Sequence, residues 1–271
     1  MTTEIDPTQS AQANYAVQLK RHREAAALTQ PQLGGHPSVM VSPKTISAVE
    51  TLHRVPTLRL SSGLDTVFKT TDLFQSLYAS YVRETGLPPD FLEYTELEAI
   101  ASQIKIYSQY VLTGLLQTEE CARQVLGVGQ RKDRLEELVA TRLARQEILR
   151  RDTPPELTLI LDQAAILKLL GGDPKIAKDQ LAHLLTCSQE PNITIHVVPF
   201  SAMTYPEAAF NVLSFDNAPD AAYHEGAAGQ GRTIEPGPKV TELAVMFDRI
   251  RSVALTAPDS EQMLRSALED T

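Results

Sequence analysis

The 271-residue sequence has no tryptophan, only two cysteines, few aromatic residues and no long apolar run. No apolar stretch approaches the roughly eighteen residues that a membrane-spanning helix needs, so we expect no membrane association. The polar start MTTEIDPTQ lacks the basic and apolar regions of a secretory signal peptide, which favours a cytoplasmic protein. Cys121 and Cys187 are too few for a disulfide framework, and neither has the Cys or His spacing of a zinc site. We expect both thiols to be reduced and at least partly buried, with no metal and no cofactor.

Charge is unevenly distributed along the chain. The formal net charge of −9 argues against a protein that coats nucleic acid non-specifically. Residues 1–80 are nearly neutral, with seven Lys or Arg against six Asp or Glu, so the rest of the chain carries the whole net negative charge. This distribution permits DNA binding by the N-terminal part alone.

Length and residue pattern together indicate two domains. Helical patterns fill the first part, at about residues 14–27, 29–34, 42–51, 57–69 and 71–85, and the segment Gly86-Leu87-Pro88-Pro89 has the composition of a linker. The second part alternates helices with strands at about 104–110, 156–161, 193–199, 211–215 and 221–224, and its Gly- and Pro-rich residues 226–239 predict a loop. We therefore predict an α+β protein. An all-α helix-turn-helix bundle over residues 1–85 precedes a mixed α/β domain over residues 90–271, with a small sheet flanked by helices.

Local capping signals set the expected helix starts. A polar side chain just before a helix can accept bonds from its first free N–H groups, and Pro suits the first helical position. Four such signals stand in the sequence: Thr29-x-x-Gln32, Ser42-Pro43, Thr95-x-x-Glu98 and Asp259 with Gln262. They predict helices that begin near residues 30, 43, 95 and 259.

The segments LTQPQL (residues 28–33) and SPKTISAVE (residues 42–50) have the order of a helix-turn-helix. They resemble the patterns LSQEELA and SxxTISRIERGxxxP of the phage-repressor-type family. The resemblance implies that the second helix reads DNA, with phosphate contacts setting the register. The DNA-binding residues carried over by position are Gln30 and Arg54 on phosphates, Ser42 at the start of the reading helix, and Lys44, Thr45 and Ser47 toward the groove.

Three positions depart from that family pattern. Pro43 stands where members commonly have Gln, Ala48 where they have Arg, and Leu52 where a Gly ends the helix. The turn is also about two residues longer and contains a proline. Lost donors weaken both affinity and specificity, since each good bidentate contact to a base contributes about 1–3 kcal/mol. A packing or dimerisation domain with little DNA affinity is therefore the alternative.

Two further segments, TGLLQTEEC (residues 113–121) and RLARQ (residues 142–146), stand out in the second part. Thr118 followed by two glutamates has the features of a helix start. The helix predicted over residues 132–151 carries Arg142 and Gln146 in the middle of its apolar stripe. A guanidinium on a buried face must be paired or reach water. We therefore expect a structural ion pair of Arg142, with Asp162 or Glu119 as candidates, or a ligand site.

Both segments resemble the motifs PGLLQTEEYAR and RLARQ of actinobacterial (Streptomyces-type) helix-turn-helix regulators, in their long antitoxin-like C-terminal domain of unknown function. Shorter matching pieces are Gly171-Gly172, Gln180-Leu181, Val198-Pro199-Phe200 and Phe247-Asp248-Arg249. The resemblance implies a transcriptional regulator of a toxin–antitoxin type that binds its own operator in double-stranded DNA. It also implies a homodimer, because two-fold operators match two-fold proteins, and a small neighbour-encoded partner protein held by the C-terminal domain.

The candidate partner- or ligand-binding residues of the second domain are Arg142, Gln146, Asp162, His224 and Glu225. No HxxxH spacing, GxSxG motif or Walker loop is present, so we do not expect an enzyme. Two alternatives to a DNA-binding regulator stay open. One is a protein-binding module whose helix-turn-helix no longer reads DNA, and the other is a small-molecule sensor or enzyme in the second domain.

Overall fold

The computed structural model describes residues 5–85, 87–128, 131–202, 208–226 and 231–271. Contacts divide the chain into two compact units, Met1–Glu96 and Leu97–Thr271. The division falls inside a helix rather than at the expected linker, of which Gly86 lies outside the described residues. Within the described residues, no helix combines the length and apolarity needed to cross a bilayer.

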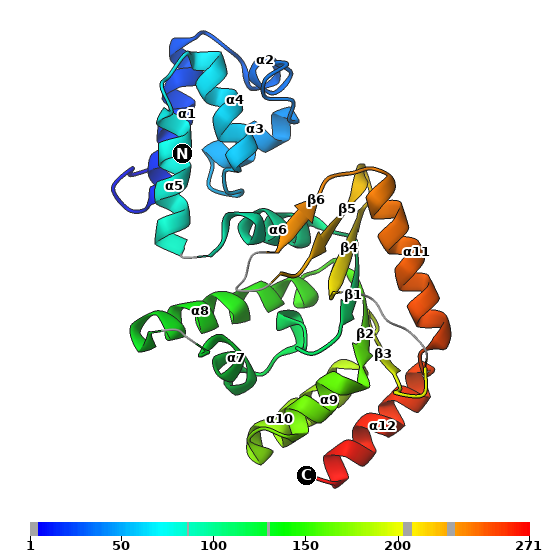
Figure 1. The fold of residues 1–271 in the computed structure, drawn as a ribbon. Coiled ribbons are helices and arrows are strands. Elements are labelled where there is room, and N and C mark those ends of the chain that lie inside the picture. Colours follow the sequence, from blue (N-terminus) through cyan, green and yellow to red (C-terminus); the bar gives the residue numbers. More distant parts are fainter. Residues whose placement is uncertain (1–4, 86, 129–130, 203–207, 227–230) are drawn as a thin grey trace. The chain divides into compact units, whose positions relative to one another are not determined.

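The first unit is entirely helical (Figure 1). Its helices are α1 (Ala11–Ala25), α2 (Gln30–Gly34), α3 (Pro43–Glu50), α4 (Leu58–Phe68) and α5 (Leu73–Thr85), followed by the start of α6 (Pro89–Ile100). A continuous core joins these helices, and its largest fully buried side chains are Tyr15, Leu19, Leu33, Ile46, Leu64 and Phe74. The hydroxyl groups of Tyr15 and Ser61 lie 2.9 Å apart within this core, so the polar tip of Tyr15 is satisfied.

Two predicted helix starts of this unit are confirmed. Thr29 and Gln32 form a complete capping box at α2, and Ser42 caps α3 with Pro43 at its first position. The helix start predicted near residue 95 is wrong, because α6 already begins at Pro89 and runs through Thr95 to Ile100. Thr95 lies inside the helix and donates its hydroxyl proton to the carbonyl of Leu92 at 2.8 Å. Burial of apolar α6 residues outweighs the local capping signal.

The second unit is built on one mixed sheet. Its strands are β1 (Gln103–Ser108), β2 (Glu156–Asp162), β3 (Ile193–Val198), β4 (Phe210–Phe215), β5 (Ala218–His224) and β6 (Arg232–Ile234), in the order β3-β2-β1-β4-β5-β6. The pairs β1–β2 and β2–β3 are parallel, and the three pairs from β1–β4 to β5–β6 are antiparallel. The predicted α+β fold class is confirmed.

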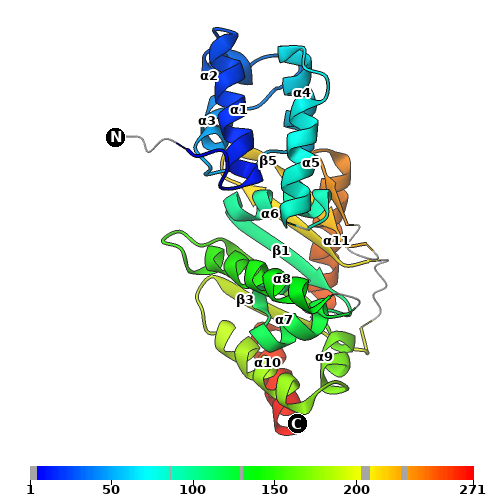
Figure 2. The same ribbon diagram turned by 90° about the vertical axis from the view of Figure 1, so that its left-hand side faces the viewer.

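Helices cover both faces of this sheet (Figures 1 and 2). One face carries α11 (Pro238–Val253), and the other carries the two crossover connections between parallel strands. These crossovers contain the 3-10 helices η1 (Gly114–Leu116) and η2 (Gln146–Arg150) and the helices α7 (Glu119–Leu126), α8 (Lys132–Arg145), α9 (Gln163–Leu170) and α10 (Pro174–Cys187). The last helix, α12 (Ala257–Glu269), packs on α10 and β3. Strand residues alternate between the faces, so Ile104 and Ile106 point to the crossover side while Lys105 and Tyr107 point to α11.

Two predictions for the C-terminal part need correction. The segment predicted as a loop over residues 226–239 contains β6 and the start of α11, although residues 227–230 lie outside the described residues. A three-residue edge strand needs only a pairing partner, which β5 supplies through the pair His224 and Arg232. The predicted cap Asp259 is also wrong, because Thr256 is the N-cap of α12 and accepts from the backbone N–H of Asp259 at 3.3 Å. Both cysteines are buried, as expected.

Candidate functional site

In the first unit, α2 and α3 are two short helices joined by residues 35–42, and they pack on each other. Leu33 and Ile46, one from each helix, are fully buried in the unit's core. Pro43 and Lys44 at the start of α3 are exposed. The arrangement therefore leaves the N-terminal end of α3 open to solvent while its opposite face is fixed.

A buried ion pair fixes α1 against α3. Arg23 donates from Nε and Nη2 to the carboxylate of Glu50 at 2.5 and 3.0 Å, and the Glu50 side chain is only 4% exposed. Gln30, expected at a phosphate, donates its amide to the same carboxylate at 2.8 Å. Geometry of this kind, with the remaining lone pairs satisfied, offsets the desolvation of the charges. Gln30 thus has a structural role in the free protein.

The remaining predicted DNA-binding residues fall into two groups. Lys44 is exposed, and Ser42 uses its hydroxyl oxygen to cap α3 by accepting from the N–H of Thr45 at 3.1 Å. Ser47 is half-buried on α3. Arg54 donates to the hydroxyl of Thr45 at 3.3 Å, so these two side chains already contact each other. Lys44 is the exposed cation of the predicted set.

Arg54 also lies near a buried carboxyl group. Its Nε is 3.7 Å from Oε2 of Glu96, and this oxygen has no hydrogen-bond partner among the described residues. Burial raises the pKa of Glu96 well above its ordinary value, and the nearby guanidinium only partly opposes this. The guanidinium expected at a phosphate is therefore held beside an acidic group of the same unit.

In the second unit, the two sequence motifs come together around η1. Gln146 donates its amide to the carbonyl oxygens of Gly114 and Gln117, each at 2.8 Å, and is itself buried. The Arg142 guanidinium donates to the side-chain oxygen of Gln117 at 2.7 Å. From α10, Gln180 donates to the carbonyl of Leu116 at 2.7 Å. We call this set of contacts the amide clamp, because three side-chain amides hold the backbone of residues 112–118.

The amide clamp explains the polar side chains on the apolar stripe of α8. Segments that leave regular structure expose backbone carbonyl groups, and a buried carbonyl needs a donor. Gln146 supplies donors for two such carbonyls, and Arg142 acts one step removed, by holding the Gln117 side chain that donates to the carbonyl of Leu112. Gly114 allows a close approach, since a Cβ there would lie 3.2 Å from Nε and 3.3 Å from Cδ of Arg142. Sequence reasoning found Arg142 and Gln146, but it gave Gln117 and Gln180 no role.

The expected ion pair of Arg142 with Asp162 or Glu119 is wrong. Glu119 pairs with Arg123 at 2.6 Å. Asp162 caps α9 by accepting from the N–H of Ala164 at 2.8 Å, and it lies 3.4 Å from the hydroxyl of Tyr107 on the α11 side of the sheet. Neither carboxylate is within ion-pair distance of Arg142 in the described part of the chain. The partner of the Arg142 guanidinium is instead the side-chain oxygen of Gln117, directly after η1.

The charge of Arg142 is balanced in part by Glu225. Burial, with the nearby Arg145, lowers the pKa of Arg142 to about 10, while Glu225 opposes this shift, so the guanidinium stays protonated at neutral pH. Desolvation in turn raises the pKa of Glu225. Arg145 makes its own buried pair, donating to Glu98 at 2.8–3.0 Å. Of the predicted second-unit residues, the structure thus brings Arg142 and Gln146 together at Gln117, and Glu225 acts on Arg142 only through its charge. His224 pairs with Phe210 and points to the α11 face, away from this group.

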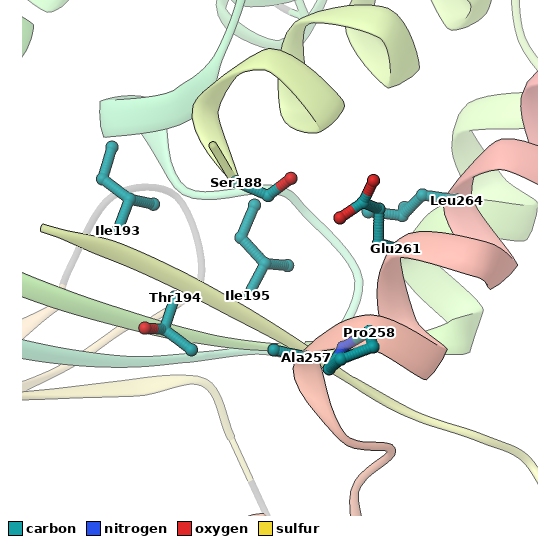
Figure 3. Close-up of a pocket in the computed structure, with 8 residues that line it drawn as sticks. All are labelled: Ser188, Ile193, Thr194, Ile195, Ala257, Pro258, Glu261 and Leu264. Atoms are coloured by element: carbon teal, nitrogen blue, oxygen red, sulfur yellow. The ribbon is translucent and has the colours of Figure 1, made fainter. Parts of the chain in front are cut away.

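Two cavities in the described part of the second unit lie outside the amide clamp itself. The smaller, of about 230 Å³, lies between β3 and the start of α12 (Figure 3). Glu261 lines it, but its carboxylate accepts a hydrogen bond from Gln189 at 3.2 Å and forms an ion pair with Arg265. The carboxylate therefore already has partners within the protein. The larger, of about 300 Å³, lies between α7 and α9 and borders residues 110–112, of which the clamp holds Leu112 through its carbonyl oxygen. No cluster of three or more potential metal ligands occurs among the described residues.

Together these features define a protein with an all-helical unit that exposes the start of a short helix, followed by an α/β unit with a mixed sheet. A family model described as a domain of unknown function, DUF5753, matches residues 91–266. The chain therefore belongs to the DUF5753 family, and the matched range includes the whole amide clamp. No curated protein and no solved structure matches the chain.

Proposed function

We propose that this chain is a DNA-binding transcriptional regulator, antitoxin-like in kind, whose first unit binds its own operator as a homodimer. The observation that carries this proposal is the arrangement of α2 and α3. The buried face of α3 is fixed by Ile46 and by the Arg23–Glu50 pair, and its N-terminal residues are exposed with Lys44 among them. A recognition helix needs this combination, because its first residues must reach base edges or phosphates without moving the unit.

A mobility-shift assay with the DNA upstream of the chain's own gene tests this proposal. We expect a complex at low salt that weakens as salt increases, because phosphate contacts release bound counterions. A shuffled duplex of the same length is the control for sequence preference. Absence of any complex at low salt, where phosphate contacts are strongest, would refute DNA binding.

A second candidate function is a protein-binding module whose α2–α3 pair no longer reads DNA. The observation that favours it is the state of the predicted phosphate ligands, since Gln30 is bonded to Glu50 and Arg54 lies beside Glu96. Under either function, we propose that the second unit binds a small protein encoded next to this chain. Co-expression with that neighbouring product, followed by size-exclusion chromatography with light scattering, measures the complex and the dimer together. Separate elution of the two proteins contradicts this partner.

A further inference from the structure

The larger cavity of the second unit has an apolar interior. It lies between α7 and α9, and residues of β2 and α10 and residues 110–112 also line it. Its lining is mostly aliphatic and includes Leu112, Val125, Leu161, Ile166, Leu169 and Leu181. A volume of about 300 Å³ lies at the lower end of the range for small-molecule sites.

Few polar groups border this cavity, and they differ in their exposure to solvent. The thiol of Cys121 is buried, and desolvation raises its pKa to about 11, so it is neutral at physiological pH. Lys168 is exposed, and no acidic side chain in the described ranges is within ion-pair distance of it. The cavity therefore combines a neutral, apolar interior with one unpaired cation among its lining residues.

We propose that this cavity binds a small amphiphile that has an unbranched apolar chain and an anionic head group. The chain would displace water from the aliphatic lining, which is the main source of affinity in such sites. A cavity at the lower end of the small-molecule range favours a short chain over a long one. The head group remains at the opening, where the Lys168 ammonium attracts it.

The amide clamp holds one side of this cavity. The side chain of Gln117 donates to the carbonyl oxygen of Leu112 at 2.7 Å, and its own oxygen accepts from Arg142. The backbone of Leu112 is thus tied to α8 through one amide. Arg142 is a positioning residue for the cavity, and the ligand contacts the wall that it holds.

Isothermal titration of the full chain with decanoate, below its micelle concentration, tests the proposal without any DNA. We expect saturable binding that Lys168→Glu weakens about fivefold or more, as loss and reversal of one exposed charge contact predicts. Lys178→Glu on α10, an exposed lysine that does not line the cavity, is the matched control and retains wild-type affinity. Decyltrimethylammonium has a similar chain with the opposite charge and should bind at least fivefold more weakly.

A second measurement locates the ligand. Decanoate should slow alkylation of Cys121 by an apolar thiol reagent and leave Cys187, which does not line this cavity, unchanged. Val125→Trp places a larger side chain in the cavity and should abolish decanoate binding, with circular dichroism reporting that the variant is folded. Equal binding of the anionic and cationic chains, equal affinity in Lys168→Glu, or unprotected Cys121 each overturns the proposal. Loss of the neighbouring protein's binding in Val125→Trp, with no decanoate binding by the wild type, would instead identify a protein-docking site.

Discussion

Gln146→Ala tests whether the amide clamp holds residues 112–118 in place. The Gln146 amide donates to two backbone carbonyl oxygens at 2.8 Å, and the side chain is only 9% exposed. Removal leaves both acceptors without a donor in a region that water reaches poorly. Each lost hydrogen bond costs about 1 kcal/mol, so the free energy of local opening should fall by about 2 kcal/mol. That change makes the open state about 30-fold more populated and amide exchange through it about 30-fold faster, since 1.4 kcal/mol is a factor of ten.

Amide hydrogen exchange followed by mass spectrometry measures this change directly. The relevant peptides cover residues 112–126, where the N–H of Leu116 donates to Thr113 and the N–H of Thr118 donates to Gln180. Gln262→Ala is the matched control, because Gln262 is exposed on α12 and has no side-chain hydrogen bond in the described part of the chain. Exchange in these peptides within about twofold of the wild type would refute the structural role of Gln146.

Three further predictions, two of them with a matched control substitution, test other parts of the structure. Gly114→Ala should destabilise the second unit by about 1–2 kcal/mol in urea unfolding because its Cβ meets the guanidinium stem at 3.3 Å, whereas Gly171→Ala, where the nearest atom is 3.5 Å away, should be neutral. Leu52→Gly should raise the unfolding free energy by about 1 kcal/mol, because residue 52 has a φ of 63° at the end of α3, where glycine is favoured. Ala48→Gly, inside α3, should lower the unfolding free energy by a similar amount. Changes of the same sign in both variants would contradict this reasoning. Glu96→Gln should be more stable than the wild type at neutral pH, with the difference growing as pH rises above the ordinary carboxyl value of 4.5, because the folded state holds the Glu96 proton more tightly than the unfolded chain. Thermal melts of both proteins between pH 5 and 8, at about every half pH unit, measure this difference. If the melting temperatures of the two proteins changed in parallel with pH, the raised pKa of Glu96 would be contradicted.

Leu52 has the left-handed backbone conformation at the position where the phage-repressor-type pattern has a helix-ending Gly. The N–H of His53 donates to the carbonyl of Ala48 at 2.9 Å, which is the six-residue bond that closes a Schellman motif. Glycine is favoured at the preceding position because it has no Cβ. The sequence pattern placed a helix-ending Gly at this position, and the structure keeps the conformation although the residue is leucine.

Signals confined to a few consecutive residues predicted the structure well. The capping residues Thr29, Ser42 and Thr118 all cap the helices expected of them, since each bond spans only three residues. The α+β class followed from the change of periodicity between the two parts of the chain. The start of α6 and the strand β6 were missed because both depend on what the segment packs against or pairs with.

The amide clamp could be predicted only in part. A cation and an amide on an apolar helix stripe showed that Arg142 and Gln146 have polar partners. Their partner Gln117 is 25 residues from Arg142 in the chain, and Gln180 is 64 residues from the carbonyl that it meets. A bond between a neutral amide and a distant backbone carbonyl leaves no mark in composition or charge. Asp162 and Glu119 were therefore the natural but mistaken candidates for the partner of Arg142.

The central proposal, DNA binding through the exposed start of α3, is tested most directly by fluorescence anisotropy with a labelled duplex from the chain's own upstream region. Lys44→Ala should weaken binding of the full chain by about tenfold, the loss expected for one good contact in the groove. Lys69→Ala removes another exposed lysine of the same unit, at the end of α4, and should leave the affinity within about twofold of the wild type. Equal affinities of the wild type and both variants, or no binding at low salt, would contradict the account.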